Sequence, residues 1–284
     1  MKKSLLKRLL CLALATVMLL SLSGCGLGSA ITAAKAARAM SKLESVSGEL
    51  NLDLELSAYG MEIPAALIAP LDFTVEPFAL QADSRLELMG NSIPAFRIFM
   101  EKEESLLKLY LGTVTTSLLG STEVWTAQQT QVKSQKKLSV STIMGVYAAL
   151  DDSFSEKGTE SVGSFTATRY DGVLSEKLVA RFFKGSGGLT VSGIEFTEEQ
   201  LIAAFADTPV SFWLDNDSYC LVKLQVDISG SADMLLSGLI SDAFAAEPDT
   251  GVYKAVLSFT VNSFDSVDAI VIPDEAKAAL ESKY

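Results

Sequence analysis

The sequence of 284 residues contains no histidine, and this absence excludes several kinds of chemistry. Histidine is the commonest general base near neutral pH and a frequent metal ligand. Its absence excludes serine–histidine and cysteine–histidine catalytic arrangements as well as imidazole metal centres. Basic residues are also scarce, with 23 lysines and arginines against 35 aspartates and glutamates, and the net charge is −12. Because binding to nucleic-acid phosphates requires clustered basic residues, this composition argues against a nucleic-acid partner.

Apolar residues, in contrast, are abundant enough for a sizeable core. They make up 49% of the chain, and charged residues make up 20%, which is typical of a globular protein. A chain of this length forms one large domain or two small ones. No linker rich in proline and serine divides residues 48–284, and candidate strands continue throughout. We therefore predict a single domain over residues 30–284.

The first 25 residues have the layout of an export signal. Four basic residues precede an apolar run at residues 9–20, which is shorter than the roughly 20 residues of a membrane-spanning helix. The sequence Leu-Ser-Gly-Cys at residues 22–25 resembles the bacterial lipobox, whose cysteine receives diacylglycerol and becomes the first residue after cleavage. We expect a lipoprotein signal peptide at residues 1–24, a lipidated Cys25 and a short tether at residues 25–29. The alternative is an ordinary secretory signal or an uncleaved anchor, with Cys25 placed by chance.

Lipidation at Cys25 implies attachment to the extracytoplasmic face of the cell membrane. Removal of residues 1–24, which carry four positive and no acidic residues, takes the net charge from −12 to −16. An acidic protein is repelled by an anionic bilayer, so the acyl chains must hold it there. Because Cys11 leaves with the signal, Cys220 remains as a single unacylated cysteine. We expect it to be buried in a strand rather than paired with another chain.

From residue 48 onward, apolar and polar residues alternate. A strand with one apolar face is predicted there, because a helix would spread the leucines around its circumference. These leucines are Leu50, Leu52, Leu54 and Leu56. Similar patterns predict strands at residues 79–89, 96–100, 106–111, 123–132, 165–174, 177–183, 210–214, 221–228 and 252–262. Polar turns predict three hairpins, which join 96–100 to 106–111, 165–174 to 177–183, and 210–214 to 221–228.

Helical spacing of apolar residues appears between these strands. It predicts helices at residues 30–46, 139–150, 197–206 and 234–244. The third of them begins with Thr-Glu-Glu-Gln, which matches a capping box. Several antiparallel strands with a few helices on one side indicate an α+β domain.

No motif for catalysis, metal binding or phosphate binding is evident. The many carboxylates, including those at residues 101–104 and 151–152, are typical of a solvated surface. Residues 215–218 resemble the start of a calcium loop but lack its later glycine and glutamate, which predicts a hairpin turn. The glycine-rich residues 184–188 lack the ending of a phosphate-binding loop, and Ser134 and Lys136 have the wrong spacing for serine–lysine catalysis. We expect no enzyme activity, no metal and no cofactor.

Several short stretches resemble one family of bacterial lipoproteins, those of the LolA/LppX-type fold, and especially uncharacterised Gram-positive members. After the lipobox and an alanine- and lysine-rich helix, the strand with alternating leucines is similar to the family's first strand. Three later stretches also resemble it: Thr168 to Gly172, Phe212 to Leu224, and Phe264 to Glu275. One departure lies in the second, where the family's turn usually carries glycine and proline and this chain has Tyr219, Cys220 and Leu221.

The resemblance implies a strongly curved antiparallel sheet, a half-barrel, that a few helices cover over an apolar cavity. Relatives carry acyl chains or lipoproteins in such cavities. We therefore predict a membrane-anchored lipoprotein that binds or carries a hydrophobic, lipidic ligand, with helices 139–150 and 197–206 as gates. The predicted cavity residues are Leu50, Leu52, Leu54, Leu56, Leu86, Leu88, Ile143 and Tyr147. The alternatives are a non-catalytic surface module with a solid core that binds an envelope protein, and, with less support, a hydrolase.

Overall fold

A computed structural model describes most of the chain after residue 34. The described residues are 35–36, 38–58, 61–104, 106–117, 120–131, 154–183, 189–191, 194–232 and 251–281. The chain divides into two compact units, each made of three segments: unit 1 comprises residues 1–41, 52–65 and 139–258, and unit 2 comprises residues 42–51, 66–138 and 259–284. The single domain over residues 30–284 stays a prediction.

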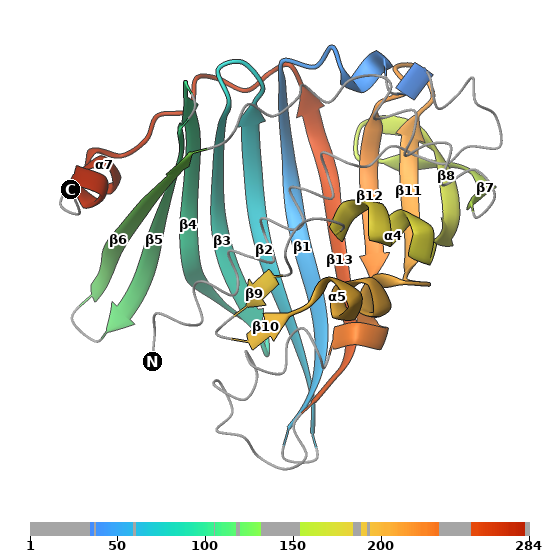
Figure 1. Ribbon diagram of the computed structural model, residues 1–284, viewed down its shortest axis with the longest axis horizontal. Coiled ribbons are helices and arrows are strands. Elements are labelled where there is room, and N and C mark those ends of the chain that lie inside the picture. The colour runs from blue at the N-terminus through green and yellow to red at the C-terminus, as the bar shows by residue number, and fades with distance from the viewer. Residues whose placement is uncertain are drawn as a thin grey trace. The chain divides into compact units, whose positions relative to one another are not determined.

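Strands dominate the described structure. Eleven of them form one sheet in the order β6-β5-β4-β3-β2-β1-β13-β12-β11-β8-β7, and β9 and β10 form a separate pair (Figure 1). The strands are β1 (Ser45–Ala58), β2 (Met61–Thr74), β3 (Ala79–Leu88), β4 (Asn91–Glu103), β5 (Leu106–Ser117), β6 (Gly120–Gln131), β7 (Phe154–Val162), β8 (Phe165–Val173), β9 (Leu189–Val191), β10 (Ile194–Phe196), β11 (Pro209–Asp215), β12 (Leu221–Asp227) and β13 (Gly251–Phe264). The pairings from β3 to β6 and from β7 through β8 and β11 to β12 are antiparallel. The predicted large antiparallel sheet with few helices is therefore confirmed.

Helices are few in the described part of the chain. They are α4 (Glu176–Phe183), α5 (Glu198–Phe205), α7 (Asp274–Glu281) and the short 3₁₀ helix η1 (Ser229–Ser231). The predicted capping box at the start of α5 is confirmed. Thr197 Oγ1 accepts a hydrogen bond from the Gln200 backbone N–H at 3.2 Å, and Gln200 Oε1 accepts one from the Thr197 N–H at 2.9 Å. Two N–H groups that the helix start leaves without partners are thereby satisfied.

One predicted hairpin is wrong. Residues 177–183, expected to pair with residues 165–174, lie in the helix α4. Strand β8 already pairs with β7 on one side and β11 on the other, so neither of its edges is open to a further strand. The hairpin partner of β8 is therefore β7, the strand before it in the sequence, and not the segment that follows it.

The other predictions differ in smaller ways from what is observed. The helix predicted at residues 30–46 ends early, because the last described helical residue is 40 and β1 begins at Ser45. The hairpins β4–β5 and β11–β12 are confirmed. Strands β2, β7, β9 and β10 and helix α7 were not predicted. The predicted helices 139–150 and 234–244, the glycine-rich residues 184–188, the carboxylates at 151–152 and the signal and tether at 1–29 lie outside the described residues.

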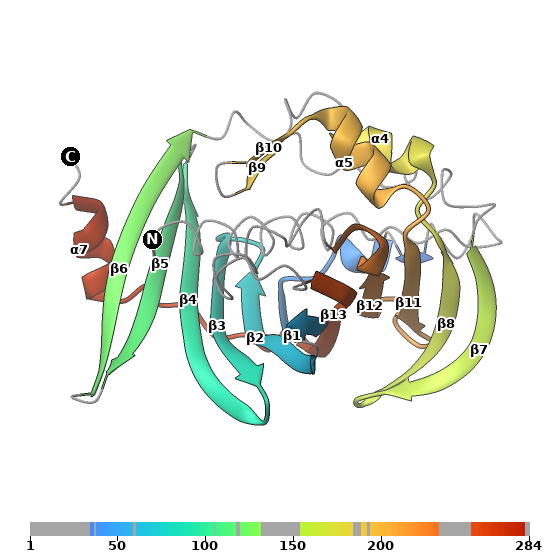
Figure 2. The same ribbon diagram turned by 90° about the horizontal axis from the view of Figure 1, so that it is seen from below.

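In unit 1, an aromatic cluster forms the core of the strands β7, β8 and β11. The Phe212 ring stacks on the ring of Tyr170, with centroids 5.1 Å apart, and lies 5.3 Å from the ring of Phe154. Helices α4 and α5 lie side by side in the same unit (Figure 2), and each buries one apolar side chain completely, Val179 and Leu201 respectively. The ribbons of β7 and β8 bend strongly along their length (Figure 2).

Candidate functional site

The predicted cavity residues fall into three groups. Leu52, Leu54 and Leu56 belong to unit 1, and the first and third of them are buried while Leu54 is half-buried. Unit 2 contains three more, of which Leu50 is buried and Leu86 and Leu88 are half-buried. Ile143 and Tyr147 lie outside the described residues. Their role as cavity residues therefore stays a prediction.

The strand register in unit 2 brings further apolar side chains together on one face of β3, β4 and β5. Directly opposite residues of antiparallel strands point to the same side of the sheet. The pairs align in two rows, Leu80 with Met100 and Leu109, and Ala82 with Ile98 and Leu111. All six side chains are buried. We call this set, Leu80, Ala82, Ile98, Met100, Leu109 and Leu111, the apolar face.

The apolar face continues toward the β3–β4 turn across a β-bulge. The register shifts between Ser84 and Arg85, so Ser84 is opposite Phe96 while Arg85 is opposite Pro94. A bulge bends its strand and tolerates a proline, which has no N–H to donate. The buried Ser84 hydroxyl donates to the Phe96 carbonyl oxygen at 2.7 Å and accepts from the Phe96 N–H at 3.0 Å, so it is fully satisfied at this point. Beyond it, the half-buried Leu86 extends the apolar face.

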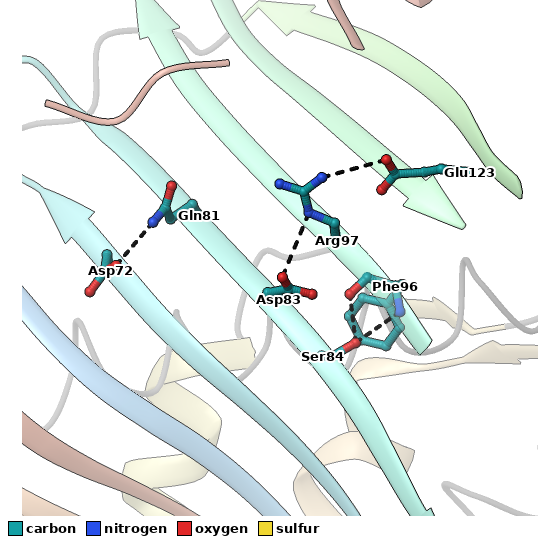
Figure 3. Close-up of polar contacts among 7 residues, drawn as sticks. All are labelled: Asp72, Gln81, Asp83, Ser84, Phe96, Arg97 and Glu123. Atoms are coloured by element: carbon teal, nitrogen blue, oxygen red, sulfur yellow. Dashed lines mark hydrogen bonds and ion pairs between the residues drawn. The ribbon is translucent and has the colours of Figure 1, made fainter. Parts of the chain in front are cut away.

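Polar side chains cover the opposite face of the same strands (Figure 3). Arg97 lies between two carboxylates, with its Nε 3.8 Å from Asp83 and its Nη1 3.5 Å from Glu123. The amide of Gln81 donates to Asp72 at 3.0 Å. Ion pairs that are partly exposed to solvent, as these are, contribute little to stability. In this part of the sheet one face is therefore apolar, whereas the other carries the charged side chains of Asp83, Arg97 and Glu123.

Toward the edge, the polar face carries an aromatic cluster. The Arg97 guanidinium lies 5.4 Å from the ring centroid of Phe99 and 5.8 Å from that of Trp125. Gly112 is directly opposite Trp125, and a Cβ atom there would lie 2.9 Å from the indole and 2.6 Å from Glu123 Oε1. The glycine thus leaves room for both side chains.

Helix α7 packs on this cluster. Ile272 and Ala276 are buried against Phe99, Tyr110 and Ala127. The Tyr110 hydroxyl donates to Glu101 at 2.8 Å. Burial, together with this carboxylate, raises the pKa of Tyr110 well above its usual value. The polar face of β5 and β6 is therefore occupied by the C-terminal segment of the chain itself.

The β4–β5 hairpin, at the end of these strands away from the β3–β4 turn, carries a group of ionic residues. Lys108 contacts both Glu101, at 3.6 Å, and Glu103. The hydrogen bond between Lys108 and Glu103 lowers the pKa of the carboxyl and raises that of the ammonium group. Both groups thus stay charged at neutral pH.

In unit 1, the residues that carry the family resemblance lie side by side. Trp213 is directly opposite Arg169 on one neighbouring strand and Lys223 on the other. The two cations lie 5.2 and 4.7 Å from the indole centroid, and the indole N–H donates to Glu160. Trp213 is only 3% exposed. These motif residues therefore stabilise strand pairing, with cation–π contacts worth about 0.5–1 kcal/mol each.

The last of the resembling stretches also has a structural role. The Asp265 carboxylate accepts hydrogen bonds from the backbone N–H groups of Glu44 and Ser45, at 2.7 and 3.1 Å. Farther along, Ile272 packs on the cluster of Phe99 and Tyr110 in unit 2. The acidic residues Asp274 and Glu275 occupy the first turn of α7. Acidic residues are favourable there because of the helix dipole.

The turn at residues 215–218 is a hairpin turn, as predicted. Asp215 Oδ2 accepts hydrogen bonds from the Ser218 backbone N–H and hydroxyl, at 2.8 and 2.7 Å. Tyr219 has a φ of +64°, in the left-handed region where glycine is favoured, so the departure from the family's glycine is accommodated with strain. The Lys35 ammonium lies 4.6 Å from the Tyr219 ring centroid. Cys220 is buried and forms no disulfide, as predicted, although it precedes β12 rather than lying in it.

Among the described residues, no group of three or more histidine, cysteine, aspartate or glutamate side chains is placed to hold a metal ion. No helix in that part of the chain is both long enough and apolar enough to cross a membrane.

Comparison with protein-family models gave no match, and comparison with curated proteins gave no significant match. Solved structures similar to the chain include a putative outer membrane lipoprotein-sorting protein domain from Vibrio parahaemolyticus, with 9% identity over 87% of this chain and 97% of that chain and a TM-score of 0.26. A DUF1329 family protein from Desulfovibrio piger has 7% identity over 83% and 92% and a TM-score of 0.23. A β-barrel-like protein of domain DUF1849 from Brucella abortus has 6% identity over 78% and 100% and a TM-score of 0.23.

Proposed function

We propose that the chain is a membrane-anchored, extracytoplasmic lipoprotein that binds or carries a hydrophobic, lipidic ligand through the apolar side of its sheet. The observation that carries this proposal is the two-sidedness of β3, β4 and β5. Buried apolar side chains line up in rows on one face and continue into half-buried leucines, whereas the other face carries charged residues on β3 and the cluster beneath α7 on β4 and β5. Ligand sites are mostly apolar, with few polar groups. The buried polar side chain beside the apolar face, that of Ser84, is already satisfied.

The proposed anchor is a diacylglycerol on Cys25. Its test is expression of the full chain, with its own signal, in a bacterial host fed an alkyne analogue of palmitate. Wild-type protein should become labelled and fractionate with membranes, and Cys25→Ser should lose the label. Cys220→Ser is the matched control and should keep it, because Cys220 is buried. Label that persists in Cys25→Ser contradicts the anchor.

The proposed ligand is tested on the membrane-extracted full chain. Non-covalent lipid is released with organic solvent and identified by mass spectrometry, while the covalent acyl chains stay on the protein. A bound lipid is expected at about one per chain, as for a single site of drug-like or lipid size. No bound lipid, with the protein folded, would favour the solid-core interaction module.

A pair of neighbouring variants locates the ligand. Leu86→Gln places an amide beside the apolar face, and Glu87→Gln places the same amide on the polar face one residue away. Because an unpaired amide is costly against an apolar ligand, the first variant should lose most of its lipid and the second none. Equal lipid content in the two variants would refute the assignment of the face.

A further inference from the structure

On its apolar side, one end of the β3–β6 sheet in unit 2 carries no charge, whereas Arg85, Glu87 and Glu123 lie on the polar face of this end. Residues 88–96, around the β3–β4 turn, contain no charged residue, and neither do residues 109–122, which include the β5–β6 turn. Leu88 pairs with Asn91, and Ser117 pairs with Gly120. Since β4 pairs antiparallel with β5, both turns lie at the same end of these strands, the lower end in Figure 1. In a chain with 20% charged residues, this is a large uncharged zone.

The other end of the same strands is charged. The β4–β5 hairpin carries Glu101, Lys102, Glu103 and Glu104 in succession, and the connection from β2 to β3 carries Glu76. The charges of unit 2 are thus distributed unevenly along its strands.

Apolar side chains are exposed at the uncharged end. Met89 in the β3–β4 turn is 68% exposed, Ile93 on β4 is 45% exposed, and Val124 on β6 is 55% exposed. Ile93 is directly opposite the half-buried Leu86, which lies on the same side of β3 as the apolar face. Ile93 is therefore continuous with the face proposed to bind lipid.

We propose that this uncharged end, defined by Leu86, Leu88, Met89, Ile93 and Val124, contacts the surface of the lipid bilayer. This inference rests on the proposed function, and it adds the place where a lipid passes between the bilayer and the apolar face. A chain with a net charge of −16 after signal removal is repelled by anionic lipid. A surface without carboxylates, such as the apolar side of this end, approaches the bilayer with the least repulsion, and its exposed apolar side chains gain free energy when they enter the boundary of the acyl chains.

The test is quenching of an introduced tryptophan by brominated lipid. The full chain is reconstituted in vesicles of equal parts phosphatidylcholine and phosphatidylglycerol, with or without brominated acyl chains. Ile93→Trp reports the uncharged end, and Lys102→Trp is the matched control, because it is exposed on the same side of β4 at the charged end. Val124→Trp is a second reporter on another strand, in case the first variant does not fold. Wild-type protein supplies the background of the two native tryptophans.

Contact with the bilayer predicts quenching several-fold stronger for Ile93→Trp and Val124→Trp than for Lys102→Trp. A brominated lipid bound as ligand also quenches, so the same variants are measured in a polymer-solubilised form that holds bound lipid without a bilayer, where most of the quenching should disappear. Quenching that persists there would overturn bilayer contact while leaving lipid binding in place. Equal quenching of the two β4 variants would overturn the inference as well. A concentration-dependent dimer that Ile93→Lys abolishes would assign this end to a second copy of the chain instead.

Discussion

Replacement of Gly112 by alanine should destabilise the protein, although alanine is the better residue for an ordinary strand. The added Cβ would lie 2.6 Å from Glu123 Oε1 and 2.9 Å from the Trp125 ring. Overpacking of this kind costs about 1–3 kcal/mol. Glycine itself costs about 0.5–1 kcal/mol in a strand because of its backbone entropy, and alanine recovers that amount. The net loss of unfolding free energy should therefore be about 1–2 kcal/mol.

The two close contacts of the new Cβ are not equivalent. The Glu123 carboxylate ends a flexible side chain whose ion pair with Arg97 is long, at 3.5 Å, so it moves at little cost. The indole of Trp125 is held more firmly, because it packs 5.9 Å from the Phe99 ring and against the cluster beneath α7. We therefore expect Trp125 to account for most of the destabilisation.

A background without the indole should reverse the sign of the effect. In Trp125→Val, the Cβ at Gly112 has space, and the substitution to alanine should stabilise the protein by up to about 1 kcal/mol. The measurement is urea unfolding of the four proteins in the double-mutant cycle, followed by circular dichroism because one tryptophan is removed. The reasoning is refuted if Gly112→Ala costs the same in both backgrounds, or if it stabilises the wild type.

Two further predictions concern the ionic and aromatic clusters. Burial raises the pKa of Asp171, but its bonds with Arg169 and a neighbouring hydroxyl outweigh this and hold the pKa below its ordinary 3.8. Because its pKa is lower in the folded than in the unfolded state, the carboxylate stabilises the fold above the unfolded pKa, and this stabilisation is lost as the pH falls through the folded pKa. In urea unfolding measured across pH, the free energy of unfolding of the wild type should therefore fall more steeply in acid than that of Asp171→Asn. Ala276→Asp should detach α7 and lower the raised pKa of Tyr110, so that tyrosinate absorbance appears at a lower pH in an ultraviolet titration. The matched control is Lys277→Asp at the exposed neighbouring position, which should leave the pKa of Tyr110 unchanged.

Local patterns predicted well those elements whose local signal agrees with their final environment. The alternating leucines of β1 needed no partner to be recognised, since a strand with one apolar face is the only regular structure that collects them. The capping box at Thr197 is likewise a local device, and both of its hydrogen bonds are present. In these segments, propensity, pattern and tertiary packing all favour the same structure.

The elements that were missed depend on neighbours that are far away in the sequence. Strand β2 contains Pro64 and Pro70, and proline argues against a strand inside a sheet. Strand β7 shows no apolar alternation, because its side chains between the buried Phe154 and Val162 are exposed. Such a strand is identified only by its pairing with β8, and that pairing also explains why residues 177–183 form a helix.

The candidate site was predictable in kind but not in composition. A strand pattern assigns the half-buried Leu86 and Leu88 to a face, but it does not say which strands lie beside them. The deeper part of the apolar face comes from Ile98 and Leu111, whose alignment with Ala82 depends on antiparallel register. The bulge next to Ser84 then shifts the pairing at the exposed end. A one-residue change of register moves every side chain to the other side of a sheet, so no reading of separate strands could have assembled this set.

The residues that carry the family resemblance and those proposed to bind lipid are different residues. Trp213, with its two flanking cations, aligns three strands, and Asp265 ties the end of β13 to the start of β1 through two backbone N–H groups. Such roles require specific side chains, which is why they form motifs that can be recognised in sequence. A hydrophobic ligand requires only apolar surface of suitable width, which leucine, isoleucine, methionine and alanine provide interchangeably. It follows that the motifs carry information about how the sheet is assembled, and that ligand identity must be sought in the lipid that the Leu86→Gln and Glu87→Gln proteins retain or lose.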